Sequence, residues 1–219
     1  MSPWPVLLSL CLLSACATAP TRYYSLASVD DSVRAEASAA SSRTEASDTR
    51  DAARGLRLEV VEVPAQVDRL QLVVQAPRRD PANEVQVLNE SLWSAALENQ
   101  LQAVLSSRVS AGLGLIDLQK LPLAADLPAR TIEVRLTRFD MVWGQFSQMT
   151  ATWVDQAPDR DAPYICEADI QVPAGSSVAE LVQSQRQATG ILSELIIHTA
   201  MGLTTAVQDY PLVSKFGCT

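Results

Sequence analysis

The sequence predicts an α+β fold, with an antiparallel or mixed β-sheet and two main helices packed on one face of it. Several short segments alternate apolar and polar residues, which is typical of half-buried strands. Two longer segments repeat apolar residues at three- and four-residue spacing, which is typical of amphipathic helices. The elements follow one another as strands, helix, strands and helix, and three consecutive strands have connections short enough for antiparallel pairing.

The N-terminus carries an apolar run at residues 6–12, followed by the letters LSAC at residues 13–16. This order resembles a bacterial lipoprotein signal peptide with its lipobox, in which Cys16 becomes the lipid-modified first residue. We therefore expect residues 1–15 to be a signal peptide, although no Lys or Arg precedes the apolar run. The run is far shorter than the ~20 residues that a membrane-spanning helix needs. An ordinary cleaved secretory signal is the alternative.

Lipid on Cys16 would hold the chain at a membrane, because each buried methylene contributes about 0.8 kcal/mol and stable anchoring needs more than one acyl chain. Ala17 follows the cysteine, where the sorting rules of such lipoproteins place Asp for retention in the inner membrane, so Ala17 indicates the outer membrane. Residues 16–27 are expected to be the anchor, the tether and a first short strand within 21–26. A tether of about 10 residues would reach at most about 35 Å.

Residues 28–54 differ in composition from the rest of the chain. They contain seven Ala, six Ser, four Arg and six Asp or Glu, with two Val as their only larger apolar residues. Such a segment cannot bury enough surface to offset its conformational entropy, so we expect a flexible low-complexity insertion. Its alanine content also allows a transient helix.

The first half of the domain is predicted as three strands and a helix. Alternation indicates strands at 56–63, 70–75 and 84–88. Asn89 is the expected N-cap of the helix that follows, and Trp93 belongs to its apolar stripe, where core packing is expected. Gly112 and Gly114 are expected to end this helix.

The second half is predicted as a short strand at 115–119, an antiparallel meander and a long helix. The meander comprises strands at 130–139, 142–154 and 164–172, with Gly144 near a turn. Ser177 and Glu180 have the spacing of a capping box, and the helix behind them is expected to run to about Val207. Residues 209–219 are expected to be a C-terminal tail.

The four cysteines divide by expected role. Cys11 leaves with the signal peptide and Cys16 takes lipid, so that Cys166 and Cys218 remain as an even pair. In a compartment that permits disulfides they are a possible bridge, which would fasten the tail to the last strand. The alternative is two unpaired thiols, with Cys166 buried as a small apolar residue.

The composition disfavours several function classes. A formal net charge of −8 argues against nonspecific binding of nucleic acid. No nucleophile elbow or phosphate-binding glycine loop is present. The single histidine, His198, has no ligand partner at metal spacing, and Asp68 and Asp140 are isolated. We therefore expect no enzyme, no cofactor and no metal.

Two tryptophans offer a possible contact with a partner. Trp143 and Trp153 lie ten residues apart on either side of the predicted turn, and one of them could point outward. Exposed aromatic side chains on a sheet suit a protein or lipid partner. The alternative for both is packing in the core.

Several segments together resemble a known family. Tyr23-Tyr24-Ser25-Leu26 follows Cys16 closely, Val61-Glu62-Val63-Pro64 precedes Asp68-Arg69, and residues 89–101 read NESLWSAALENQL. With Arg138-Phe139-Asp140 and the last helix, this order resembles the ABC-type transport auxiliary lipoproteins, the PqiC-like group. The resemblance assigns residues 55–208 to that domain.

The resemblance also implies a role. Such proteins accompany an inner-membrane transport component and a periplasm-spanning MCE-domain protein, and are linked to phospholipid movement between the two membranes. They would sit on the periplasmic side of the outer membrane, and relatives are believed to form homo-oligomeric rings. Two alternatives stay open: a structural lipoprotein that assists outer-membrane assembly, and a membrane-anchored hydrolase with an unrecognised site.

Overall fold

The structure is a computed structural model that describes residues 20–27, 55–77, 84–121, 127–203 and 210–219. The expected signal peptide at 1–15, the lipidation residue Cys16 and the expected insertion at 28–54 lie outside the described residues. Within the described ranges the elements are β1 (Arg22–Tyr24), β2 (Gly55–Glu62), β3 (Gln71–Gln75), β4 (Val85–Trp93), α2 (Leu97–Leu113), β5 (Ile116–Asp117), the short 3-10 helix Leu118–Lys120, β6 (Ala129–Val142), β7 (Phe146–Gln156), β8 (Tyr164–Pro173), α3 (Val178–Ala200) and β9 (Val213–Cys218).

The described strands form one mixed sheet, which confirms the α+β class. The order along the sheet is β1-β4-β3-β6-β7-β8-β9, with β2 beside β6 and β5 beside β2. Strands β6, β7 and β8 are the antiparallel meander that the sequence predicts. Strands β1 and β4 run parallel, as do β2 and β6. Strand β6 is therefore the centre of the sheet, because it carries β7 on one side and both β2 and β3 on the other.

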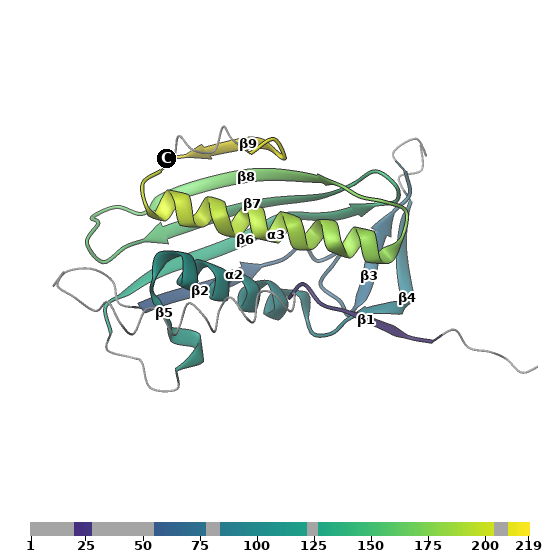
Figure 1. Ribbon diagram of the computed structural model, residues 1–219, viewed down its shortest axis with the longest axis horizontal. Coiled ribbons are helices and arrows are strands. Elements are labelled where there is room, and N and C mark those ends of the chain that lie inside the picture. The colour runs from purple at the N-terminus through teal and green to yellow at the C-terminus, as the bar shows by residue number, and fades with distance from the viewer. Residues whose placement is uncertain (1–19, 28–54, 78–83, 122–126, 204–209) are drawn as a thin grey trace, which may run out of the picture.

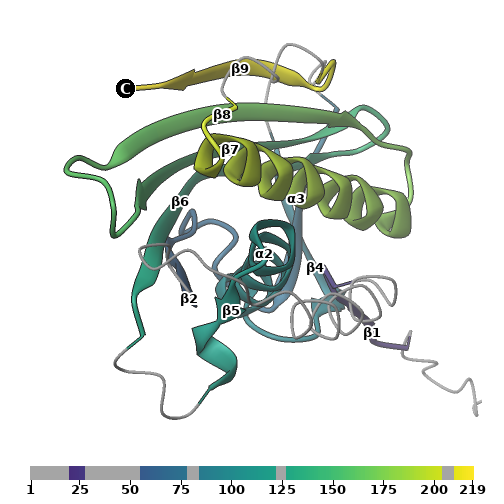
Figure 2. The same ribbon diagram turned by 60° about the vertical axis from the view of Figure 1, so that its left-hand side comes forward.

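Both helices lie on the same face of the sheet, as predicted (Figure 1). Helix α3 packs over β6, β7 and β8, while α2 packs over β2 and against α3. The sheet curves around the two helices (Figure 2). The alternating residues of the strands that face the helices are buried and form one core with the helix stripes, including Leu58, Ile132, Val134, Met149, Leu101, Leu192 and Leu195.

The ends of the two helices follow the predicted signals in part. Ser177 and Glu180 form the expected capping box, and Gly114, with φ 65°, ends α2. Helix α3 ends at Ala200 rather than near Val207. Gly202, with φ 76°, lies just beyond it in a left-handed conformation that breaks the helical path.

The prediction that Asn89 caps the first helix is wrong. Strand β4 continues through residues 89–93, and α2 begins only at Leu97. The Trp93 N–H donates to the Leu70 carbonyl (2.7 Å), and residues 91–93 pair with β1. These partners are distant in sequence and override the local helical spacing. Trp93 is in the core as expected, 2% exposed, but at the end of a strand.

Two further boundaries differ from the predictions. Residues 143–145 form a turn around Gly144, whose φ is 61°, so that β6 extends to Val142 and β7 starts at Phe146. The expected C-terminal tail contains strand β9, which pairs antiparallel with β8. The pairing gives the backbone groups of the C-terminus partners at the edge of the sheet.

Candidate functional site

The segment at residues 20–27 links the expected anchor to the folded domain, and it contains β1. Strand β1 lies parallel to the end of β4, with Tyr23 opposite Leu92 and Tyr24 opposite Trp93. The Ser94 N–H donates to the Tyr24 carbonyl at 2.7 Å. Only five residues, 17–21, separate Cys16 from β1, which is shorter than the tether expected from the sequence.

The residues after β1 are held by both helices. Leu26 is 1% exposed and belongs to the core. Its N–H donates to Oε1 of Gln100 on α2 (2.9 Å), and Nε2 of Gln100 donates to the Ala95 carbonyl (2.8 Å). On α3, Nε of Arg186 donates to the Ser25 carbonyl (2.7 Å). The buried side chain and these bonds fix the segment to the domain.

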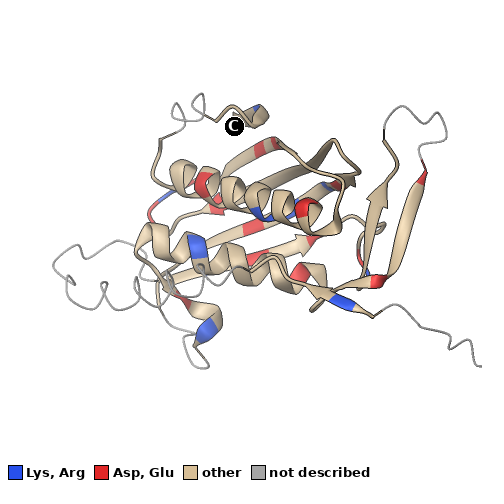
Figure 3. Ribbon diagram, turned by 45° about the vertical axis from the view of Figure 1, so that its right-hand side comes forward, with Lys and Arg blue, Asp and Glu red and all other residues tan. Residues whose placement is uncertain are grey.

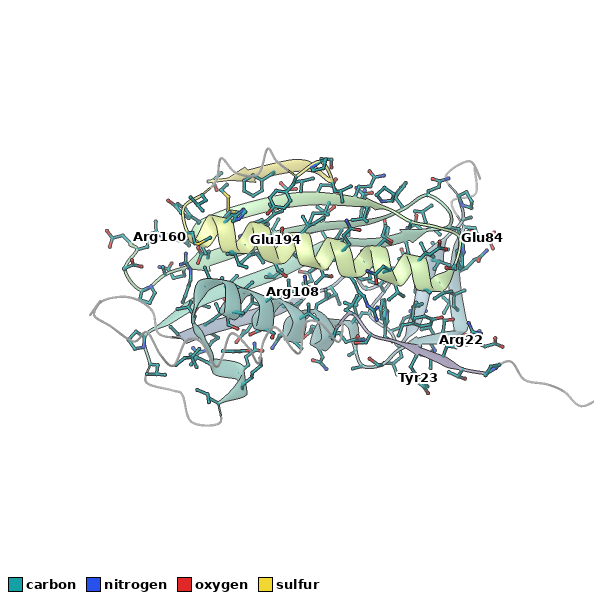
Figure 4. The ribbon with its side chains drawn as sticks, in the orientation of Figure 1. Arg22, Tyr23, Glu84, Arg108, Arg160 and Glu194 are labelled. Carbon is teal, nitrogen blue, oxygen red and sulfur yellow. A yellow bond between two sulfur atoms is a disulfide. The ribbon has the colours of Figure 1, made fainter. Side chains whose placement is uncertain are left out.

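Exposed apolar side chains lie beside this segment. Tyr23 is 68% exposed and Leu70 is 50% exposed. Leu92 lies between their strands, because it pairs with Tyr23 on β1 and with Gln71 on β3. Arg22 and Tyr23 project from β1 away from the rest of the fold (Figure 4). We call the set Arg22, Tyr23, Arg69, Leu70 and Leu92 the tether-end surface.

The opposite edge of the sheet carries a covalent link. Cys166 on β8 and Cys218 on β9 face each other in the register and are joined by a disulfide with a sequence separation of 52 residues. The Lys215 ammonium lies 2.7 Å from a carboxylate oxygen of Glu167, across the same pair of strands. The last strand is therefore tied to its neighbour by a bond between side chains as well as by its backbone.

The structure places the two candidate partner-contact tryptophans differently. Trp153 is 1% exposed, and its indole N–H donates to the Thr199 hydroxyl on α3 (3.3 Å). The expectation that Trp153 could meet a partner is therefore wrong, because alternation along β7 turns it toward the helices. Trp143 is half-buried in the β6–β7 turn and packs against the core.

A buried charge cluster was missed by the sequence reasoning. Asp155 is fully buried near the end of β7. Its carboxylate accepts two hydrogen bonds of 2.6 Å from the Arg130 guanidinium, and Nη1 of Arg160 lies 3.4 Å from its Oδ2. Arg130 also donates to the carbonyl of Ala200, at the end of α3 (2.9 Å). The alternation of β7 puts Asp155 on the same face as Trp153. A carboxylate on a buried face needs a cation, and this signal could have located the cluster.

The groups considered for catalysis are dispersed. Asp68 is exposed in a turn, and the carboxylate of Asp140 lies 3.5 Å from Arg138. The His198 ring lies 6.0 Å from the Tyr210 ring, between centroids. Over the described ranges, no group of His, Cys, Asp and Glu is arranged to hold a metal ion. None of the helices in the described part of the chain combines the length and apolar composition needed to cross a membrane.

One carboxylate has a shifted pKa. The hydrogen bond from the Ser177 hydroxyl, followed by that from the Ser177 backbone N–H, lowers the pKa of Glu180 below its ordinary value. The capping box at the start of α3 explains this shift, since both bonds favour the ionised carboxylate.

Comparison with known proteins identifies the family. The sequence model of the ABC-type transport auxiliary lipoprotein component matches residues 37–196. The chain belongs to this family. It is thus an auxiliary component of an ABC-type transport system. As a member of a lipoprotein family, it is anchored at a membrane. A comparison with curated proteins gave no significant match.

A solved structure shares the fold. The crystal structure of an uncharacterized protein has a TM-score of 0.61 and 17% sequence identity, covering 83% of this chain and 99% of its own. The crystal structure of protein XCC0632 from Xanthomonas campestris has a TM-score of 0.47 and 17% identity, covering 71% of this chain and 86% of its own. At this identity the first likeness shows the fold alone.

Proposed function

We propose that this protein is a non-catalytic accessory lipoprotein of an ABC/MCE-type transport system, held through Cys16 on the periplasmic side of the outer membrane. The system would move phospholipid or another lipophilic cargo between the inner and outer membranes. The observation that carries the proposal is the family match over residues 37–196. The finer parts rest on the residues around Cys16 and on the resemblance of the chain to the PqiC-like group.

The anchor is supported by the sequence that precedes β1. A short apolar run, two small residues and Cys16 stand directly before a segment that is bonded into the domain. Acyl chains on Cys16 would therefore hold the whole domain close to the bilayer. Ala17 supports the outer membrane as the destination.

The buried polar groups described above pair with one another inside the fold, which supports a function in which the surface of the protein binds partners. Asp155 is paired with Arg130 and Arg160, and the hydroxyls of Ser147 and Ser184 lie 2.6 Å apart between β7 and α3. These groups hold the elements together. The half-buried Trp143 and the polar face of the sheet opposite the helices are candidate contacts for an MCE-domain partner, an inner-membrane component or further copies of this chain.

The polar face is organised by ion pairs between neighbouring strands. Arg135 on β6 lies 2.7 Å from the carboxylate of Glu62 on β2, and Lys215 on β9 lies 2.7 Å from that of Glu167 on β8. Acidic and basic positions are interspersed over the helices and strands (Figure 3). A surface of mixed charge suits a specific protein partner better than it suits a polyanion.

The anchor is tested with Cys16→Ser. We expect this variant to leave the membrane fraction and to lose the acyl mass from its mature N-terminus, because the thiol at the lipobox position is removed. The matched control is the double variant Cys166→Ser with Cys218→Ser, which also lacks cysteines but keeps Cys16 and should stay in the membrane fraction. An unmodified N-terminus in the native protein would overturn the anchor.

The partner is tested separately, by cross-linking in intact cells followed by purification of the lipid-anchored chain. Recovery of an MCE-domain protein supports the transport role. Recovery of barrel-assembly components without it would instead favour a role in outer-membrane assembly and contradict this proposal.

A further inference from the structure

We propose that the tether-end surface rests on the lipid headgroup layer of the same membrane that holds Cys16. This inference rests on the proposed anchor and adds an orientation to it. It assigns Tyr23 and Leu70 to direct contact with lipid, in addition to the acyl chains on Cys16.

The first argument is the length of chain outside the fold. Six residue steps lead from Cys16 to Arg22, the first residue of β1. Fully extended, they span at most about 22 Å. A tether of this length keeps β1 next to the bilayer.

The second argument is that the tether cannot lengthen beyond Leu26. Leu26 is buried in the core, and the backbone around it is bonded to Gln100 and Arg186 on two different helices. Even with β1 detached from β4, these contacts would hold the chain at Leu26, ten residue steps and at most about 36 Å from Cys16. The end of the domain that carries β1 therefore faces the membrane, while β5 lies at the other end (Figure 1).

The third argument is the chemistry of the side chains at this end. Tyr23 and Leu70 are among the most exposed large apolar side chains of the described residues, at 68% and 50%. A tyrosine has an apolar ring and a polar tip, so it suits the boundary between headgroups and acyl chains. Moving the apolar side chain of a leucine out of water lowers the free energy.

The charges at this end indicate which lipid property matters. Arg22 and Arg69 are exposed, but so are Asp68, beside Arg69, and Glu90, beside the Ser91 that pairs with Arg22. The two signs balance locally, so attraction to anionic headgroups should contribute little. We expect contact with a neutral phosphatidylcholine surface and little change when anionic lipid is added.

The test uses the full lipid-anchored chain in phosphatidylcholine vesicles. Leu70→Cys and Tyr23→Cys are each labelled with an environment-sensitive fluorophore, and a lipid with a nitroxide on its headgroup serves as quencher. The matched control is Ile116→Cys at the other end of the domain, because Ile116 is 48% exposed and Leu70 is 50% exposed.

We expect the probes at positions 70 and 23 to lose fluorescence to the quencher, and the probe at 116 to keep it. Equal quenching, or none, at positions 70 and 116 in protein that floats with the vesicles would overturn the proposed orientation while leaving the anchor intact. Protein that does not float with the vesicles would instead show that the anchor has failed.

Discussion

Two of the outer strands of the sheet, β1 and β9, are secured in different ways. Strand β1 is three residues long, parallel to its neighbour, and held by a buried side chain and by bonds from two helices. Strand β9 is six residues long, antiparallel to its neighbour, and held by a disulfide. Outer strands expose unpaired backbone groups and are the first parts of a sheet to open.

The difference shows that the stability of an outer strand need not come from its own ladder. Strand β1 has few backbone bonds, so its order depends on Leu26 and on the two polar side chains that hold the residues beside it. Strand β9 has a longer ladder and a covalent link but little buried apolar surface, since Phe216 and Val213 are only half-buried. The first strand should therefore respond to packing and the second to redox state.

The largest expected effect is at β9. Replacing both Cys166 and Cys218 by Ala should lower the free energy of unfolding by about 4 kcal/mol, since the disulfide closes a long loop in the unfolded chain. Urea denaturation measures this loss. Hydrogen exchange should show that β9 amides lose protection beyond the global change while β1 amides do not. Equal loss at both strands would show that they open as one unit.

The next effect is at β1. Leu26→Ala should lower the free energy of unfolding by about 3 kcal/mol, because it leaves a cavity in the core. The control is Leu70→Ala, which shortens an exposed leucine and should change stability by less than about 0.5 kcal/mol. Thermal denaturation compares the two variants. Similar midpoints for both would show that Leu26 is not packed as described.

A smaller effect is expected from the helix side of the same contact. Arg186→Met keeps most of the apolar stem but removes the donor to the Ser25 carbonyl, so the expected loss is about 1 kcal/mol. Exchange of the Leu26 amide should accelerate. Gln187→Met, at the next and exposed position of α3, is the control and should leave that amide unchanged. No difference between the variants would remove Arg186 from the set that holds β1.

The smallest effect concerns pH and the start of α3. The pKa of Glu180 is lower in the fold than its ordinary value of 4.5. The capping box therefore contributes stability above that value, and the contribution is lost as pH falls through the lower, folded pKa. The measurement is the free energy of unfolding as a function of pH in the acid range. Glu180→Gln should remove the loss of stability due to this group, and Ser177→Ala should reduce it in the same way. Unchanged profiles in both variants would contradict the role of the box.

The cap of α3 is also expected to affect two parts of the sheet differently. Arg186, which holds β1, lies nearer the capped end of α3, whereas Thr199, which bonds Trp153, lies near its other end. Weakening the cap should therefore raise exchange at β1 and at the start of β7, where Ser147 contacts Ser184, before it affects the Trp153 end of β7.

Local pattern predicted the elements whose partners are near in sequence. The alternation at 130–139 predicted β6, because it reflects the burial of one face of the strand. The spacing of Ser177 and Glu180 predicted the start of α3, because the bonds of a capping box join residues within four positions. Residues 89–93 carry helical spacing but form a strand, since their partners are Leu70 and β1. No local rule includes such partners.

The candidate site was less accessible to sequence reasoning than the fold. The apolar run before Cys16 indicated an anchor, and Cys166 and Cys218 were recognised as a pair. The hold on Leu26 was missed, because Gln100 and Arg186 resemble ordinary polar residues on the solvent side of a helix. Strand β9 was missed because Ser214, Lys215 and Gly217 leave it without a clear alternation.

The parallel arrangement of β1 and β4 gives the domain a mechanical property. A pull from Cys16 would enter the fold along the length of β1 and reach the Leu26 contact at its far side. Its hydrogen bonds to β4 lie across that direction, so they would share the force and fail together instead of opening one after another. A force applied at Cys16 would therefore be shared between the sheet, through β4, and the two helices, through Gln100 and Arg186.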